Sequence, residues 1–346
     1  MNQAPVSVVI PTYNRREMVR DAIDSVLAQT LQPAQIVLVD DGSKEDYGPS
    51  LARYGKRITY HRQENGGLSA ARNTGIRLAG EPYIAFIDDD DVWHPRKLEL
   101  QMRAMQRDPE ISLLGTDQFD WPAAQFPAIP ESADARVARV TWEQLIVRTL
   151  IPISSVLVRR DLLDRVGLFD MTLRISQDRD LFLRVSEVAK VAMIQLPLLG
   201  YRDTPGSLCK LLDQRELEQR QILRQVDERG SFRGRWLLRC KAHSYMHHSC
   251  SVVHAWAGDH AGATARALKA LLYYPLPYRR DEVNMPLARP KRLAVNLLRL
   301  ARLKRPDAGP AAKPAPAADA LQGVRRAVAE RLAAPSLAVP SMSPVA

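Results

Sequence analysis

Short apolar runs alternate with helical patterns over the first two hundred residues of the chain. Val6 to Ile10 is rich in β-branched residues, apolar positions from Val19 to Leu27 recur at helical spacing, and Ile36 to Val39 is again strand-like. The alternation continues with strand-like runs at Ile58 to His61, Tyr83 to Ile87 and Ile111 to Leu114, and with helical patterns that open near Ser69 and at Pro95. This pattern predicts an α/β fold in which helices cover both faces of a parallel sheet.

The composition divides the chain into three parts. Residues 1–212 carry the α/β pattern, residues 213–305 have helical periodicity, and residues 306–346 are rich in proline and alanine. A segment of the last kind buries too little apolar surface to offset the entropy of ordering it. We therefore expect an α/β domain, a helical C-terminal extension and a disordered tail.

The formal net charge of +10 is concentrated towards the C-terminus, where residues 276–305 contain nine basic residues and two acidic ones. In a helix formed by this basic segment, one side would carry leucines and the other arginines: Leu293, Leu297 and Leu300 against Arg292, Arg299 and Arg302. Such a helix could lie on an anionic membrane surface or pack, solvated, on the rest of the protein. No recognised nucleic-acid-binding motif accompanies the charge, so we expect no nucleic-acid partner.

Cysteine usage and the length of apolar runs indicate a cytoplasmic location. Cys209, Cys240 and Cys250 are odd in number and show no CxxC spacing, which argues against a disulfide framework. The N-terminus has no signal-peptide pattern, and no apolar run reaches the roughly 18 residues of a membrane span. We expect a cytoplasmic protein, in peripheral contact with the inner face of the cell membrane if the basic segment binds lipid.

Five residues of types that bind zinc follow one another at helical spacing: Cys240, His243, His247, Cys250 and His254. On one straight helix the first and last would be about 20 Å apart, so the set cannot converge on a single tetrahedral ion. We interpret the stripe as a packed helix face.

Polar segments follow the predicted strands, where an α/β sheet binds its ligands. These segments are Pro11 to Arg15, Asp40 to Ser43, Asn65 to Asn73 and Asp88 to Asp91. Four consecutive aspartates repel one another unless a cation or hydrogen-bond donors offset their charge. Hard oxygen ligands favour Mg²⁺ or Mn²⁺, and Mg²⁺ typically completes its coordination with waters and substrate phosphates. The run therefore indicates a diphosphate-bearing substrate, and the alternative is a solvated acidic turn.

No glycine-rich phosphate loop accompanies these acids. The GxxxxGK[ST] pattern is absent, and Gly66-Gly67 does not form GxGxxG, so neither a P-loop nor a Rossmann dinucleotide site is indicated. Arg72, at the start of a helix, could bind a phosphate together with the helix N-terminus. The other interpretation is a surface arginine.

The order of these motifs resembles that of the family 2 glycosyltransferases, which have the GT-A fold. The resemblance covers about the first 210 residues and rests on PTYNR, VDDGS, NGGLSAARNTG, FIDDDDVW, SSVLVRRDLLDRVGLFD and SQDRDLFLR. It implies a mixed, mostly parallel sheet flanked by helices. It also implies an inverting transfer of a sugar from a nucleotide-diphosphate sugar, with UDP favoured, to a hydroxyl of a glycan or lipid-linked acceptor. Cell-surface polysaccharide or glycolipid biosynthesis is the implied setting.

The resemblance also implies roles for individual residues. Tyr13 and Asp41 would hold the nucleotide base, Asp88 or Asp89 the ribose, and Asp90 the Mg²⁺ or Mn²⁺ ion. Which of the four consecutive aspartates binds the metal stays open. The expected nucleotide-sugar-binding residues are Pro11, Tyr13, Arg15, Asp41, Gly67, Arg72, Asp88, Asp89 and Arg202.

The base that takes the proton from the acceptor hydroxyl is expected at the start of a later helix. Family members carry a Glu-Asp pair there, which makes Asp178 the candidate and leaves Gln177 in place of the usual Glu. The alternative role for Asp178 is a helix cap, with Asp180 in the first turn. Arg202 is a candidate diphosphate contact in a loop where Thr204 replaces a frequent His.

Two other functions stay open. Gln177 departs from the family pattern, as it would in a catalytically inert nucleotide-sugar-binding or scaffold protein. A sugar nucleotidyltransferase is disfavoured, because PTYNR is not the glycine-rich, lysine-bearing loop expected there. Between Phe119 and Ala138 the sequence predicts a long irregular loop that suits acceptor recognition.

Overall fold

The computed structural model describes residues 3–122, 125–130, 136–204, 212–278 and 287–301, together with residues 325, 326, 328 and 329. The expected disordered tail, residues 306–346, lies outside the described residues apart from those last four. Cys209 and Arg302 also lie outside them.

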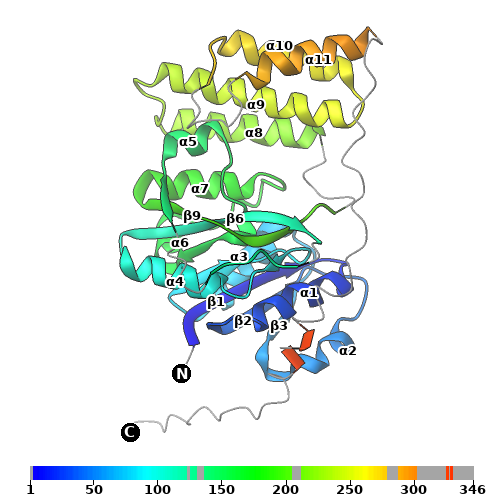
Figure 1. Cartoon of the computed structure of the whole chain (residues 1–346), viewed down its shortest axis with the longest axis vertical. Helices are drawn as coiled ribbons and strands as arrows, with labels where there is room; N and C mark the ends of the chain where they lie inside the picture. The colour runs from blue at the N-terminus through cyan, green and yellow to red at the C-terminus, as the bar shows by residue number, and fades with distance from the viewer. Residues whose placement is uncertain are drawn as a thin grey trace.

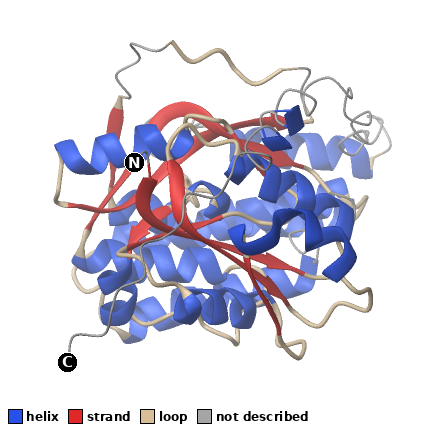
Figure 2. Cartoon of the chain, turned by 90° about the horizontal axis from the view of Figure 1, so that it is seen from below, coloured by secondary structure: helices blue, strands red, loops and turns tan. Residues whose placement is uncertain are grey.

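A twisted mixed sheet runs through the middle of the molecule (Figure 2). Its strands are β1 (Gln3–Thr12), β2 (Gln32–Asp40), β3 (Thr59–Arg62), β4 (Tyr83–Phe86), β5 (Val92–Trp93), β6 (Ile111–Trp121), β7 (Val137–Val140), β8 (Leu157–Arg159) and β9 (Lys190–Arg202). They lie in the order β3-β2-β1-β4-β8-β6-β9-β5, with β7 also paired to β9. Strands β3, β2, β1 and β4 are mutually parallel, β6 is parallel to β9, and the β4–β8, β6–β8, β5–β9 and β7–β9 pairs are antiparallel. The mixed sheet flanked by helices that the resemblance implies is thus confirmed, and the parallel arrangement expected from the alternation is found in β3, β2, β1 and β4.

Helices cover both faces of this sheet, and further helices lie beyond them. They are α1 (Arg16–Leu27), α2 (Gly48–Leu51), α3 (Leu68–Leu78), α4 (Lys97–Arg107), α5 (Trp142–Val147), α6 (Arg160–Val166), α7 (Gln177–Val188), α8 (Leu212–Glu228), α9 (Trp236–Trp256), α10 (His260–Tyr273) and α11 (Ala288–Leu300), with 3₁₀ turns at Ala52–Arg57 and Ile153–Ser155. Alternate residues of β1 explain the two layers. Val6, Val8 and Ile10 share a core with α1 and α4, whereas Val9 faces the core of α3, α5, α6 and α7.

Helices α8 to α11 form a further layer beyond α7, away from β1 to β3 (Figure 1). The Cys and His stripe lies on one helix, α9, as predicted. Its His243 and His247 stack on Tyr273, and His254 hydrogen-bonds Asp259. Across the described ranges, no group of three His, Cys, Asp or Glu side chains could hold a metal ion.

The basic segment forms the helix α11, which packs on its neighbours through polar residues. In α11 the buried residues are Arg289, Asn296 and Arg299, whereas Leu297 and Leu300 are exposed. Arg289 is drawn inward because its guanidinium donates to Ser244 Oγ at 2.8 Å and to the carbonyls of Tyr274 and Leu276. None of the helices in the described part of the chain is long and apolar enough to span a membrane.

Two smaller predictions also need correction. The helix expected at Pro95 begins at Lys97. The predicted loop is shorter than 119–138, because Phe119 and Trp121 continue β6 and Val137 and Ala138 begin β7. Trp121 is buried with Val92, which explains why the strand extends so far.

Candidate active site

A pocket of about 390 Å³ opens at the carboxyl ends of β1, β2 and β4. Of the predicted site residues it is lined by Pro11, Tyr13, Arg15, Asp41, Arg72, Asp88, Asp89, Asp90, Asp178 and Arg202. Gly67 does not line it. Segments that are far apart in the sequence thus meet at the place that the strand-end rule indicates.

The loop after β1 folds back towards the aspartates. Asn14 has a left-handed φ of 53°, and its backbone N–H donates to Ser43 Oγ at 2.8 Å. The next N–H, of Arg15, donates to the Tyr47 hydroxyl at 2.8 Å. This turn exposes the side chain of Tyr13 and directs Arg15 to the aspartate run.

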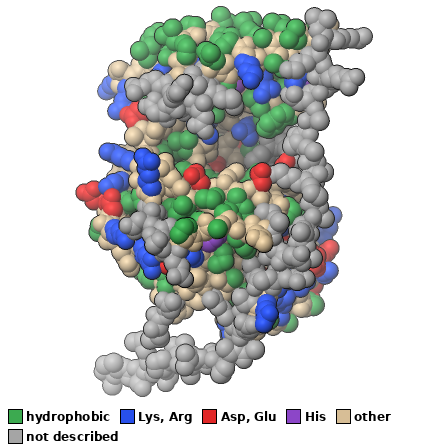
Figure 3. All heavy atoms as spheres, viewed as in Figure 1, with side chains coloured by type: hydrophobic (Ala, Val, Ile, Leu, Met, Phe, Trp, Pro, Cys, Tyr) green, Lys and Arg blue, Asp and Glu red, His purple; other side chains and the backbone are tan. Residues whose placement is uncertain are grey.

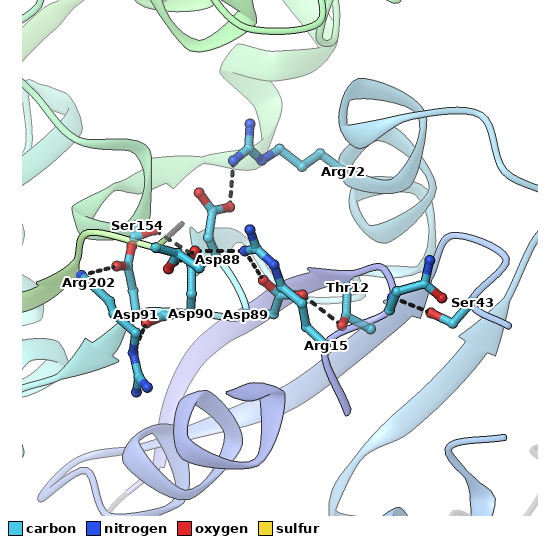
Figure 4. A network of polar contacts seen from close by, with 12 residues as sticks. Thr12, Arg15, Ser43, Arg72, Asp88, Asp89, Asp90, Asp91, Ser154 and Arg202 are labelled. Atoms are coloured by element: carbon cyan, nitrogen blue, oxygen red, sulfur yellow. Dashed lines mark hydrogen bonds and ion pairs between the residues drawn. The ribbon is translucent and has the colours of Figure 1, made fainter. Parts of the chain in front are cut away.

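Protein groups compensate the charge of the central aspartates (Figure 4). Asp89 accepts hydrogen bonds from Thr12 Oγ1 at 2.8 Å and from Arg15 Nη1 at 2.9 Å. The same Arg15 nitrogen lies 2.6 Å from Asp90 Oδ2, which also accepts from Thr204 Oγ1 at 2.9 Å. One guanidinium therefore holds two neighbouring carboxylates.

The outer aspartates have different partners. Asp88 Oδ1 accepts from Arg72 Nη2 at 2.5 Å, and its backbone N–H donates to Ser154 Oγ. Asp91 accepts from the backbone N–H of Arg202 at 3.1 Å. The Arg202 guanidinium donates to the Asp90 carbonyl and to a carboxylate of α1, Asp21. Arg202 thereby links the segment Asp90-Asp91 to α1.

Burial raises the pKa values of three aspartates in the run. It raises the pKa of Asp89 to about 7, although Arg15 opposes the shift. For Asp90 the upward shift is again opposed by Arg15 and reinforced by Asp88. The pKa of Asp91 lies well above its usual range through burial and repulsion from Asp90 and Asp88. Additional positive charge in this pocket would favour the ionised carboxylates.

The donor set fits a divalent cation. Arg15 and Thr204 contact Oδ2 of Asp90, and Arg72 contacts Oδ1 of Asp88. Oδ1 of Asp90 and Oδ2 of Asp88 take no part in these three contacts. One or two carboxylates with substrate phosphates and waters satisfy Mg²⁺ or Mn²⁺. Asp90 and Asp88 are thus able to hold such an ion.

Arg72 and Gln177 carry polar atoms that lack a hydrogen-bond partner among the residues with described positions. The side chain of Arg72 is 1% exposed, with Nε and Nη1 unpaired, and it stacks on Phe169 at 5.4 Å. Gln177 Oε1 is likewise buried without a partner. Buried unpaired groups are costly, so a ligand that pairs with them gains affinity.

Asp41 holds a glycine turn. Its carboxylate accepts hydrogen bonds from the backbone N–H groups of Gly66 and Gly67, at 2.9 and 2.8 Å, and from Gln63 Nε2 at 2.7 Å. Gly67 has a φ of 85° and caps α3, which carries Arg72. The sequence expectation placed Gly67 on the ligand, whereas the structure places it on Asp41.

Asp178 lies inside the first turn of α7 and lines the pocket. The N-cap of this helix is Ser176, so the alternative role of Asp178 as the cap is wrong. Its Oδ1 accepts from the Arg179 N–H at 2.7 Å. Burial raises the pKa of Asp178, while Arg72 opposes the shift. A raised pKa brings a carboxylate closer to what a general base at neutral pH requires.

Sequence reasoning missed Glu218, a buried carboxylate of α8. It accepts hydrogen bonds from the backbone N–H groups of Arg174, Ile175 and Ser176, at 2.8, 2.8 and 2.9 Å. These residues lead into α7, so Glu218 connects the helical extension to Asp178. A glutamate in a polar helix gives no sequence signal for this contact.

Glu218→Gln should lower the free energy of unfolding by about 2 to 4 kcal/mol. The three backbone N–H groups lose their charged acceptor, and the NH₂ group of the new amide cannot accept from them. Urea unfolding of the two proteins measures the difference. Glu228→Gln is the matched control, since Glu228 lies exposed on the same helix, and it should change stability by less than about 0.5 kcal/mol. Equal stability of the Glu218 variant and the parent would contradict the role.

Residues 7–165 match the family model for Glycosyl transferase family 2. An uncharacterized glycosyltransferase of Rickettsia typhi is 33% identical over 192 residues, which cover 53% of this chain and 60% of that protein. The putative teichuronic acid biosynthesis glycosyltransferase TuaG of Bacillus subtilis is 33% identical over 164 residues, which cover 45% of this chain and 62% of the relative. The chain therefore spans less than two thirds of the length of these relatives.

Solved structures share the fold. TarS 1-349 of S. aureus in complex with UDP-GlcNAc matches with a TM-score of 0.53 and 16% identity, covering 79% of this chain and 93% of that one. The mannosyltransferase PcManGT of Pyrobaculum calidifontis, in complex with GDP-Man and Mn²⁺, matches with a TM-score of 0.52 and 17% identity, covering 85% and 87%. At these identities the likeness concerns the fold alone. The chain thus shares the GT-A fold of these structures, and its residues 7–165 match the family model of the family 2 glycosyltransferases.

Proposed function

We propose that this protein is an inverting glycosyltransferase that moves a sugar from a nucleotide-diphosphate sugar to a hydroxyl of a glycan or lipid-linked acceptor. The observation that carries the proposal is the convergence of Asp88, Asp90, Arg72 and Asp178 on one pocket. Carboxylates able to hold a cation, a buried arginine and a candidate base are the groups that this reaction needs. The catalytic domain in this proposal is residues 1–212, followed by a helical extension over 213–305 and a tail over 306–346.

The donor would enter between the loops after β1, β2 and β4. We assign the base to Tyr13 and Asp41, the ribose to Asp88 or Asp89, and the diphosphate to Arg72, whose unpaired nitrogens favour an anion. The fold neighbours hold UDP-GlcNAc and GDP-Man, which supports a nucleotide-sugar donor, and we favour a UDP-sugar.

The chemistry follows from the positions of the chain's own groups. Asp178 would take the proton of the acceptor hydroxyl as that oxygen attacks the anomeric carbon, on the side opposite the departing nucleoside diphosphate. Arg72 would bind the departing diphosphate and thereby favour its release. Asp90, with Asp88 beside it, would hold Mg²⁺ or Mn²⁺, which would neutralise the charge that develops on this leaving group. A single displacement inverts the sugar carbon.

The setting is also a proposal. The name of TuaG refers to teichuronic acid biosynthesis, which supports a role in cell-surface polysaccharide or glycolipid synthesis. Cys240 and Cys250 are free thiols, which supports a cytoplasmic location. A lipid-linked acceptor would bring the protein into peripheral contact with the inner face of an anionic cell membrane.

Donor turnover tests the proposal. The full chain with Mn²⁺ or Mg²⁺ is incubated with UDP-, GDP- and dTDP-sugars, and the release of nucleoside diphosphate is followed with and without a chelator. We expect metal-dependent release from one donor class, or metal-dependent binding of that donor where no acceptor is present. If no nucleotide sugar binds, the proposal fails and an inert scaffold is the better interpretation.

A further inference from the structure

The outer surface of the helical layer is apolar. On α10 the exposed residues Ala261, Ala265, Leu268 and Leu272 follow one another along one stripe, and Leu272 is 75% exposed. The adjoining helix α11 and its connection add exposed leucines. We call Leu268, Leu272, Leu276, Leu287, Leu297 and Leu298 the apolar face. Figure 3 shows hydrophobic side chains gathered across this end of the molecule, over α10 and α11.

The inward sides of the same helices have the opposite character. Helix α10 buries only small residues, Ala263, Ala267 and Ala270, against α9. Two α9 hydroxyls reach its backbone, because Ser244 Oγ donates to the Ala270 carbonyl and Ser251 Oγ to the Ala263 carbonyl. A surface helix of a water-soluble domain normally turns its larger apolar side chains inward. Here the leucines point outward, so they are available to a partner.

The described residues of α10 and α11 carry only basic charge, and Asp281 and Glu282 lie in the connection outside the described residues. Residues 260–278 and 287–301 contain no aspartate or glutamate. Lys269 and Lys291 are exposed on these helices, with Arg266 and Arg292 half-buried beside them. Apolar residues combined with exposed cations match the boundary of a bilayer that contains anionic lipids. The exposed aromatic side chain of Tyr273, on α10 itself, suits the headgroup level.

We propose that the apolar face of α10 and α11 docks this protein on an anionic lipid bilayer. A second copy of the chain is a poorer partner, because two such faces would bring Lys269 and Lys291 of each copy against like charges. The inference rests on the proposed function in one respect: a lipid-linked acceptor would lie in the same bilayer, beside the docked enzyme.

Vesicle co-sedimentation of the full chain tests the docking. We expect binding to phosphatidylcholine vesicles that contain phosphatidylglycerol to exceed binding to pure phosphatidylcholine at least about tenfold. Leu272→Ser with Leu297→Ser should weaken binding to the anionic vesicles about 100-fold, since each substitution removes a leucine that lipid would bury. Lys269→Glu with Lys291→Glu should abolish the preference for anionic vesicles.

Matched controls separate docking from misfolding and from catalysis. Leu78→Ser with Val188→Ser changes exposed residues of α3 and α7 and should bind vesicles as the parent does. Donor binding and nucleotide release without vesicles should be unchanged in all these variants. If the proposed function is wrong, these two measurements fail while the vesicle measurements are unaffected. The docking proposal is overturned if the parent does not sediment with anionic vesicles. It is also overturned if sedimentation velocity shows a dimer that the Leu272/Leu297 variant cannot form.

Discussion

Replacing Asp178 by Asn should lower kcat for sugar transfer by about 10²- to 10⁴-fold, because it removes the group that accepts the proton of the attacking hydroxyl. The substitution keeps the shape of the side chain. An amide oxygen can still accept the Arg179 N–H that Asp178 Oδ1 accepts at 2.7 Å, so the first turn of α7 should keep its geometry. Steady-state release of nucleoside diphosphate in the presence of an acceptor measures the effect, and donor affinity should change by only a few-fold.

The pH profile gives a second readout of the same role. Burial raises the pKa of Asp178, and a base is active only when it is ionised. The transfer rate of the parent should therefore fall as the pH drops through this raised value. The Asn variant should lose the part of the acid limb that belongs to Asp178, while the raised pKa values of Asp89, Asp90 and Asp91 leave the rest.

Asp180 provides the matched control for Asp178. It lies in the same helix turn but forms an ion pair with Arg184 at 2.8 Å and does not line the pocket. Asp180→Asn should lower stability while leaving kcat within about a few-fold of the parent. An Asp178 variant that keeps kcat within tenfold would rule out the base assignment.

The part of the site that could be predicted from the sequence depends on local pattern. Apolar strands that end in Pro11 to Arg15, Asp41 and the aspartate run place those residues at one edge of a parallel sheet by topology alone. Their spacing also carried the family resemblance, which gave Asp178 its role. Strands β1 to β4 and helices α1 and α3 were predictable because each has its own period and its own polar ending.

The part that could not be predicted depends on contacts between distant segments. The four aspartates suggested a need for positive charge, but nothing local indicated that Arg15 would bridge Asp89 and Asp90, or that Thr204 would join them from more than a hundred residues away. Glu218 belongs to the same class, because its three partners lie 42 to 44 residues earlier.

The orientation of α11 has a related cause. Periodicity identifies an amphipathic helix, but which side packs inward depends on the neighbouring helices. The Ser244 hydroxyl of α9 and two carbonyls of the segment after α10 accept hydrogen bonds from Arg289. A leucine at this buried position would leave these acceptors without a donor. The helix therefore buries Arg289 and Arg299 and exposes Leu297, Leu298 and Leu300.

Replacing Asp90 by Asn should weaken the joint binding of Mn²⁺ and a nucleoside diphosphate by more than about 100-fold. Loss of a residue that only supports a metal ligand already lowers metal affinity by roughly 10- to 100-fold, and Asp90 is the proposed ligand itself. The amide can still accept from Thr204 Oγ1, and Arg15 keeps its contact with Asp89, so the loop should remain folded. What is lost is the negative charge that a hard divalent cation requires. Electron paramagnetic resonance of Mn²⁺ with UDP reports binding without turnover.

Asp88→Asn separates the two candidate carboxylates. Asp88 is held by Arg72, so its substitution frees that arginine and should alter nucleotide affinity more than the affinity for Mn²⁺ alone. If Asp90→Asn binds Mn²⁺ as the parent does while Asp88→Asn does not, the ion belongs on Asp88 and the ribose on its neighbour. The order of the two effects thus decides between Asp88 and Asp90 as the metal ligand, because Arg72 already pairs with Asp88 and Arg15 with Asp90.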